Sequence, residues 1–107
     1  MDHRLKKAKQ FSYIYKKGKR ANSQHFTLFS VESKFKTYKI GYSISKKIGK
    51  ANKRNLLKRR LREVVRTLSL PKDNHNYVLL AKIGAAELSF EEIKNQVVSL
   101  FEKWNTF

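Results

Sequence analysis

The chain has 107 residues and a formal net charge of +17, with 25 Lys and Arg against eight acidic residues. This length predicts one domain over residues 1–107, and a 40% hydrophobic share is enough for a small core. The lack of cysteine excludes a disulfide framework and a thiolate-ligated zinc site. Because no apolar run approaches the ~18 residues of a membrane span and no signal peptide is recognisable, we expect a cytoplasmic protein.

The positive charge is concentrated in the first two thirds of the chain. Residues 1–20 hold eight Lys or Arg and one acid, and residues 46–66 hold ten with one acid, whereas residues 67–107 hold four with five acids. This distribution predicts a polyanionic partner, of which nucleic acid is the default, and a last third that serves as scaffold. A membrane surface is less favoured, because no basic stretch has a broad lipid-seeking apolar face.

The first half of the chain predicts a helix followed by two strands. Apolar residues at i, i+3 and i+4 from Phe11 predict a helix over residues 8–17. Residues 25–32 predict a strand with large side chains on both faces, so that both faces are expected to be covered or used. Alternation of apolar and polar residues over 38–45 predicts a half-buried strand. As consecutive strands, the two are expected to pair as a hairpin.

The second half predicts a basic amphipathic helix, a buried strand and a final helix. After Gly49, apolar residues fall within a sector of about 100°, which predicts a core-facing helix that ends near Pro71. This stripe consists of Leu57, Leu61, Val64, Val65 and Leu68. Residues 77–81 predict a strand in mid-sheet, parallel to the strand before the crossover helix. Ser89 and Glu92 form a capping box that starts the final helix.

The basic helix also carries a ladder of cations. Arg54, Lys58 and Arg62 stand at i, i+4 and i+8, about 6 Å apart per step. An Arg fork can grip two phosphate oxygens, Lys adds a point charge, and an Asn amide can read a base edge or a 2′-hydroxyl. A solvated charged face is the alternative, but such faces usually interleave Glu with Lys, and here only Glu63 does so.

The segment from Ser43 to Glu63 closely resembles the signature of the bacterial ribonuclease P protein subunit family. The letters S-I-S-K-K-I-G-K-A run into R-N-L-L-K-R-R-L-R-E, which contains the family core R-N-x-x-K-R-x-x-R. The helix with Phe11 and Tyr15, the first strand and the start of the last helix match as well, so the resemblance covers nearly the whole chain. One departure is Asn52, where the family usually has an apolar residue; it affects the expected packing of the first helical turn.

This resemblance implies both a fold and a function. The implied fold is a compact α/β (α+β) sandwich in the order α-β-β-α-β-α, ribosomal-protein-S5-like, with a central mixed sheet and a left-handed β-α-β crossover. The general preference for right-handed crossovers does not predict that hand. The implied function is that of an endoribonuclease subunit: a catalytic RNA binds Mg²⁺ and cleaves, and no organic cofactor is needed. The protein binds ribonuclease P RNA and the 5′ leader of precursor tRNA, with no membrane or DNA partner.

The resemblance also assigns residues to two contacts. The residues expected to face the catalytic RNA are Arg54, Asn55, Lys58, Arg59 and Arg62. The residues expected to bind the leader are Phe11, Tyr15, Phe29, Lys46 and Lys47. Aromatic rings beside cations suit single-stranded RNA, because bases stack on the rings and phosphates meet Lys. Without the resemblance, the pair Phe11 and Tyr15 would more often be core, and a solvated strand end is the alternative for Lys46 and Lys47. No residue is assigned a catalytic or metal-binding role.

Two other classes of function stay open. A structural, ribosomal-type RNA-binding protein would bind ribosomal RNA and leave precursor cleavage unaffected. A self-sufficient nuclease would use His3 or His25 as a general base, but no paired acid is visible in the sequence. A DNA-binding protein is less favoured, since nothing resembles a helix-turn-helix. We also expect the charge of +17 to leave the free protein partly unfolded at low salt and stabilised by sulfate or phosphate.

Overall fold

The computed structural model describes residues 3–105, with side chains described through Lys103. Its elements are α1 (Ala8–Lys17), β1 (Lys19–Asn22), β2 (Phe26–Glu32), β3 (Lys39–Ser43), α2 (Ala51–Thr67), β4 (His75–Ala81) and α3 (Phe90–Asn105). Two short 3-10 turns, η1 (Lys46–Ile48) and η2 (Ala85–Glu87), precede α2 and α3. Among the described helices, none combines the length and apolar character needed to cross a membrane.

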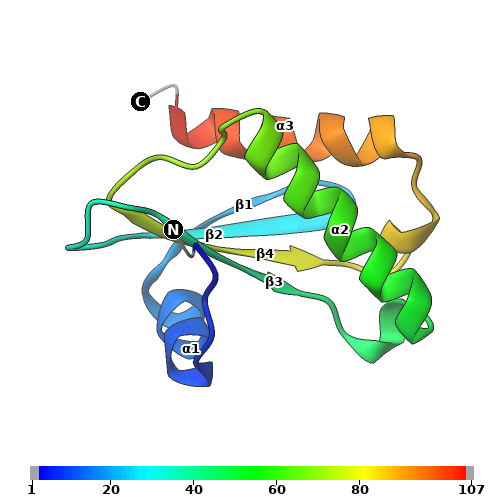
Figure 1. Ribbon diagram of the computed structural model, residues 1–107, viewed down its shortest axis with the longest axis horizontal. Coiled ribbons are helices and arrows are strands. Elements are labelled where there is room, and N and C mark those ends of the chain that lie inside the picture. Colours follow the sequence, from blue (N-terminus) through cyan, green and yellow to red (C-terminus); the bar gives the residue numbers. More distant parts are fainter. Residues whose placement is uncertain (1–2, 106–107) are drawn as a thin grey trace.

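A four-stranded sheet with the order β1-β2-β4-β3 forms the middle layer. β2 pairs antiparallel with β1 and β4, whereas β3 and β4 are parallel, as predicted. α2 connects these parallel strands and lies on the same side of the sheet as α3, while α1 lies on the opposite side (Figure 1). The crossover through α2 is left-handed (Figure 1). The expected α+β class with a mixed central sheet is therefore confirmed.

Two details of the predicted topology are wrong. The strands expected to form a hairpin, β2 and β3, are not neighbours, because β4 lies between them. The hairpin joins β1 and β2 instead. Alternation of apolar residues does not reveal β1, because its sequence Lys-Arg-Ala-Asn buries only Ala21. The described order is therefore α-β-β-β-α-β-α.

The larger hydrophobic cluster joins the sheet to α2 and α3. Four residues of the predicted stripe, Leu57, Leu61, Val64 and Val65, are each at most 2% exposed. The fifth, Leu68, is 41% exposed, because α2 ends at Thr67 and Leu68 forms its cap.

The predicted capping box at the start of α3 is confirmed. The backbone N–H of Ser89 donates to Glu92 Oε1 at 3.1 Å, and the N–H of Glu92 donates to Ser89 Oγ at 3.2 Å. Both bonds satisfy backbone donors that a helix start leaves without partners. The scaffold helix therefore begins where the local sequence dictates.

A smaller cluster holds α1 against the other face of the sheet. Ile14 of α1 is buried with Phe29 of β2 and Val78 of β4. Phe11 crosses β3 at Gly41, where a Cβ atom would lie 2.6 Å from the Cε1 atom of the Phe11 ring. The bare backbone of Gly41 is thus the surface on which that ring rests. Both faces of β2 are covered, as its large side chains on both sides predicted.

Residues 3–5, called here the N-terminal arm, run beside the outer edge of β3. The N–H of Ile40 donates to the His3 carbonyl at 2.7 Å, and the N–H of Leu5 donates to the Ile40 carbonyl at 3.2 Å. The His3 ring stacks on Tyr38 with centroids 4.0 Å apart. The arm therefore adds a short parallel bridge to the sheet and places His3 over β3.

Candidate nucleic-acid interface

The outward face of α2 gathers most of the residues predicted to face RNA. Asn55, Lys58, Arg59 and Arg62 line a hollow of about 450 Å³ together with Asn52 and Leu56. They meet because residues three and four positions apart are neighbours on a helix surface. Within the described residues, none of these three cations forms an ion pair. The hollow therefore presents uncompensated positive charge beside two amide side chains.

Arg54, the first member of the predicted ladder, lies outside this hollow. Its Nε donates to the Gly49 carbonyl at 3.1 Å and ties the start of α2 to the preceding loop. The unusual Asn52 does not unwind the first turn, because α2 begins at Ala51 and Asn52 Oδ1 accepts the N–H of Lys53 at 2.9 Å. The Nε atom of Arg54 is therefore engaged by the protein's own backbone, and the contact of Arg54 with RNA stays a prediction.

The aromatic residues predicted to bind the leader lie together on the opposite side of the sheet. The Tyr15 and Phe29 rings meet edge to face with centroids 4.9 Å apart. The Arg20 guanidinium lies 5.8 Å above the Phe29 ring centre. Phe29 is only 8% exposed, whereas Tyr15 is 37% exposed. Tyr15 thus offers the stacking surface of this pair, while Phe29 supports it from β2.

Lys46 and Lys47 occupy a different place from the aromatic group. Both are exposed on η1, which follows β3 and is anchored by the buried Ile48. Ile48 belongs to the cluster beneath α2 and α3, and in Figure 1 η1 lies beyond the end of β3, at the opposite end of the sheet from α1. The predicted leader residues therefore form two separated groups, and their joint contact with one RNA strand stays a prediction.

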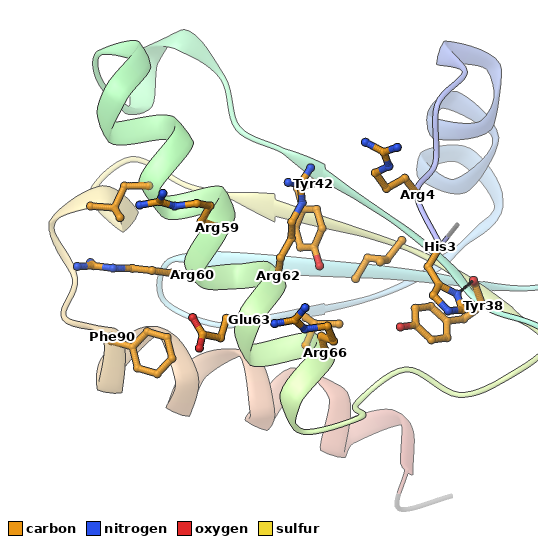
Figure 2. Close-up of a pocket in the computed structure, with 13 residues that line it drawn as sticks. His3, Arg4, Tyr38, Tyr42, Arg59, Arg60, Arg62, Glu63, Arg66 and Phe90 are labelled. Carbon is orange, nitrogen blue, oxygen red and sulfur yellow. Dashed lines mark hydrogen bonds between the residues drawn. The ribbon is translucent and has the colours of Figure 1, made fainter. Parts of the chain in front are cut away.

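A larger groove of about 710 Å³ lies between α2 and β3, and we call it the α2–β3 groove. Figure 2 shows that Tyr42 and Arg62 lie close together in it, with Arg66 beside them and His3 and Tyr38 across from them. We call this part the tyrosine end. It is lined by His3, Arg4, Tyr38, Tyr42, Arg62 and Arg66. Arg60, Glu63 and Phe90 lie at the other end (Figure 2).

The tyrosine end contains residues that the sequence reasoning did not assign to a site. Tyr38 and Tyr42 follow the alternation of a half-buried strand, so their pattern is also that of ordinary core. Arg66 continues the spacing of Lys58 and Arg62 by one more turn of α2, which was the available signal. β3 precedes α2 in the sequence and β4 follows it, and it is the parallel pairing of these two strands that brings Arg66 on α2 over Tyr38 and Tyr42.

The environment of Tyr42 keeps its hydroxyl protonated. Burial raises the pKa of Tyr42 far above its ordinary value of 10.0, and the nearby Arg62 charge only partly opposes this shift. Burial, followed by the negative charge of Asp73, likewise raises the pKa of Tyr38. Both phenols are therefore hydrogen-bond donors at neutral pH.

The histidines make structural contacts. His3 Nδ1 lies 2.8 Å from the Tyr38 carbonyl, and His25 Nδ1 lies 3.0 Å from the side-chain nitrogen of Gln96. His75 Nδ1 lies 2.9 Å from the Asp73 carbonyl. Across residues 3–105, no group of three His, Cys, Asp or Glu side chains is placed to hold a metal ion.

Comparisons with known proteins agree on one family. The family model described as Ribonuclease P matches residues 1–105. The ribonuclease P protein component of Bacillus cereus strain 03BB102 is 33% identical over 103 residues, covering 94% of this chain and 90% of the relative. That of Streptococcus agalactiae strain NEM316 is 28% identical over 100 residues, covering 94% and 92%.

A solved structure extends this similarity to three dimensions. The 2.0 Å structure of the Staphylococcus aureus RNase P protein superposes with a TM-score of 0.90 at 27% identity. The match covers 97% of this chain and 96% of that one, so all layers of the fold are shared. On the family match over residues 1–105 and these relatives, the chain belongs to the ribonuclease P protein family.

Proposed function

We propose that this chain is the protein subunit of bacterial ribonuclease P and works in the cytoplasm. It binds the catalytic RNA subunit and the 5′ leader of precursor tRNA. It thereby assists hydrolysis of the phosphodiester bond that joins the leader to the mature tRNA, which keeps a 5′-phosphate. The observation that carries this proposal is the cationic hollow on α2, on a helix whose other face is buried, in a chain that matches the family over residues 1–105.

The hollow on α2 supports a contact with folded RNA. Lys58, Arg59 and Arg62 are carried by a folded helix, so their backbone is already ordered when phosphates bind. Each phosphate neutralised by such a cation releases counterions, which makes affinity fall as salt rises. The same charges would screen the repulsion between the catalytic RNA and the precursor. Phosphate screening therefore explains how a small basic domain assists a reaction carried out by RNA.

The aromatic group supports a contact with the single-stranded leader. Tyr15 is exposed on α1 and rests on Phe29, so its ring is held in place for stacking. Stacking of a base on such a ring is worth about 1–3 kcal/mol and tolerates any base. A grip on the leader favours the precursor over the mature product, since the product lacks that strand.

The Mg²⁺ required by the reaction is assigned to the RNA. The proposed interface consists of cations, amides and aromatic rings, and it contains none of the carboxylates through which proteins usually bind Mg²⁺. RNA phosphates supply such oxygens. The residues of this interface therefore do not fit Mg²⁺ binding, and their roles are to bind RNA and to position the leader.

The test is leader removal from a precursor tRNA by the cognate RNA subunit at limiting Mg²⁺, with and without the protein. We expect the protein to lower the Mg²⁺ concentration needed for cleavage. The variant Lys58→Gln/Arg62→Gln should bind the RNA subunit more weakly and with a shallower salt dependence, by about one unit of log–log slope per cation removed. The matched variant Lys36→Gln/Lys94→Gln, which removes two charges that line neither the hollow nor the α2–β3 groove, should behave like the parent protein.

The outcomes separate the proposed function from its rival. If the protein leaves the Mg²⁺ requirement unchanged while it binds ribosomal RNA tightly, a structural RNA-binding role replaces the proposal. If both double variants lose affinity equally, net charge and not the face of α2 accounts for binding. Cleavage of the precursor by the protein without any RNA subunit would also contradict the proposal.

A further inference from the structure

The tyrosine end of the α2–β3 groove has cations that the rest of the protein does not neutralise. Arg62 and Arg66 reach into it from successive turns of α2 (Figure 2). Neither forms an ion pair with any residue that the structure describes. Two guanidinium groups one helical turn apart can bind the non-bridging oxygens of one phosphate, because each offers a planar pair of N–H donors.

The same end of the groove offers aromatic surface and hydrogen-bond donors. Tyr42 lies on β3, and Tyr38 directly precedes this strand. Neither hydroxyl has a hydrogen-bond partner within residues 3–105. A half-buried phenol without a partner gains from a ligand that supplies an acceptor. The carbonyl oxygens and ring nitrogens of a nucleobase are such acceptors, and its π-face can lie against a tyrosine ring.

We propose that the tyrosine end of the groove binds one unpaired nucleotide of the RNA subunit, with its phosphate between Arg62 and Arg66 and its base against Tyr42 and Tyr38. The proposal rests on the function proposed above and adds a pocket to it. The whole groove, with both ends included, has a volume of about 710 Å³, which lies in the range of pockets that bind small ligands. Bases inside a duplex cannot leave the stack without cost, so an unpaired nucleotide is the form that reaches the tyrosines.

The position of the groove favours the RNA subunit over the leader as the source of this nucleotide. Arg62 lines both the groove and the cationic hollow on α2, so one RNA can occupy the two together. Tyr15 and Phe29 lie on the other side of the sheet with α1 (Figure 1). A strand gripped there would have to pass around the sheet edge that the N-terminal arm covers.

The first test compares the affinities of three variants for the RNA subunit alone. Arg66→Gln removes one phosphate ligand and should weaken binding about tenfold or more, whereas Tyr42→Phe removes only a hydroxyl and should weaken it about three- to tenfold. Arg60→Gln removes the same charge from the other end of the groove and should cost about twofold or less. Equal losses for Arg60→Gln and Arg66→Gln, or parent affinity for Tyr42→Phe, would overturn the proposal.

A second measurement identifies the source of the nucleotide. Chemical probing of 2′-hydroxyl reactivity at saturating protein should show an unpaired nucleotide of the RNA subunit that the parent protein protects and Arg66→Gln and Tyr42→Phe do not. Preference for precursor over mature tRNA should be the same in these variants as in the parent. Loss of that preference with unchanged affinity for the RNA subunit would place the nucleotide in the leader and overturn the assignment.

Failure of this inference can be told from failure of the proposed function. If the parent protein does not bind the RNA subunit, the proposed function fails. If the parent binds but both groove variants bind equally well, only the nucleotide pocket is refuted. Circular dichroism in sulfate serves as the check that all three variants are folded.

Discussion

Gly41 offers a direct test of how α1 is fixed to the sheet. A Cβ atom added at Gly41 would lie 2.6 Å from Cε1 of Phe11 and 3.2 Å from Cβ of Leu5, whereas ordinary contact begins at 3.4 Å. Gly41→Ala therefore forces the Phe11 ring away from β3. Overpacking of this kind typically costs about 1–3 kcal/mol of unfolding free energy. For a domain of this size, that corresponds to a fall in melting temperature of roughly 5–20 °C.

The assay is thermal and urea unfolding in sulfate, combined with a double-mutant cycle. Gly41→Ala should be markedly less destabilising in a Phe11→Ala background, because the smaller side chain leaves room for the new methyl group. The coupling between the two positions is expected to be about 1–2 kcal/mol. Ser43→Ala, two residues farther along the same face of β3, is the control for a substitution that adds no atoms beside the Phe11 ring.

The functional consequence should be selective. Displacement of α1 moves Tyr15 away from Phe29, so preference for precursor over mature tRNA should fall while affinity for the RNA subunit through α2 is kept. Additive effects of the two substitutions, within about 0.5 kcal/mol, would refute the reasoning that Phe11 rests on Gly41. Equal loss of both binding activities would show that α1 and α2 do not act as separate contacts.

Two further predictions concern the helices on the other face of the sheet. Leu61→Ala, at a fully buried position, should lower the unfolding free energy by about 2–5 kcal/mol. Leu56→Ala, at a position that is 39% exposed, should lower it by less than about 1 kcal/mol. Similar losses for the two variants in urea unfolding would contradict the assigned buried face of α2. Hydrogen bonds from the Ser89 amide, and then its hydroxyl, lower the pKa of Glu92 below 4.5. The ionised Glu92 carboxylate therefore stabilises the folded state above pH 4.5, and this contribution is lost as pH falls through the lowered pKa. The advantage in melting temperature of the parent over Glu92→Gln should therefore shrink on acidification, and a constant difference would show that the charge of Glu92 does not contribute.

Local signals in the sequence predicted the helices well. The range 8–17 for α1 and the capping box of α3 depend on short-range spacing and side-chain hydrogen bonds, which the chain carries in each segment. The stripe from Leu57 to Val65 follows from the helical period alone. Leu68 was the exception, because the end of α2 depends on the following loop, where Ser69 adopts a positive φ of 48°.

The order of strands and the groove depend on contacts that no local pattern encodes. β1 is held by pairing with β2, and its own side chains are mostly solvent-exposed. β4 enters between β2 and β3 only after α2 has crossed the sheet, so sequence neighbours are separated in space. The groove arises at the meeting of the N-terminal arm, β3 and α2, which are brought together by that crossover. The family resemblance implied the crossover, but not the pocket beside it.

The two edge strands of the sheet, β1 and β3, indicate how the protein without bound RNA resists self-association. An open strand border invites pairing with another copy, and short, positively charged strands discourage it. β1 is such a strand, since it has four residues and begins with the exposed Lys19 and Arg20. At the opposite border, His3 and Leu5 pair with Ile40 of β3. Deleting residues 1–5 would therefore leave the edge of β3 uncovered. The expected result is concentration-dependent aggregation or strand exchange between copies.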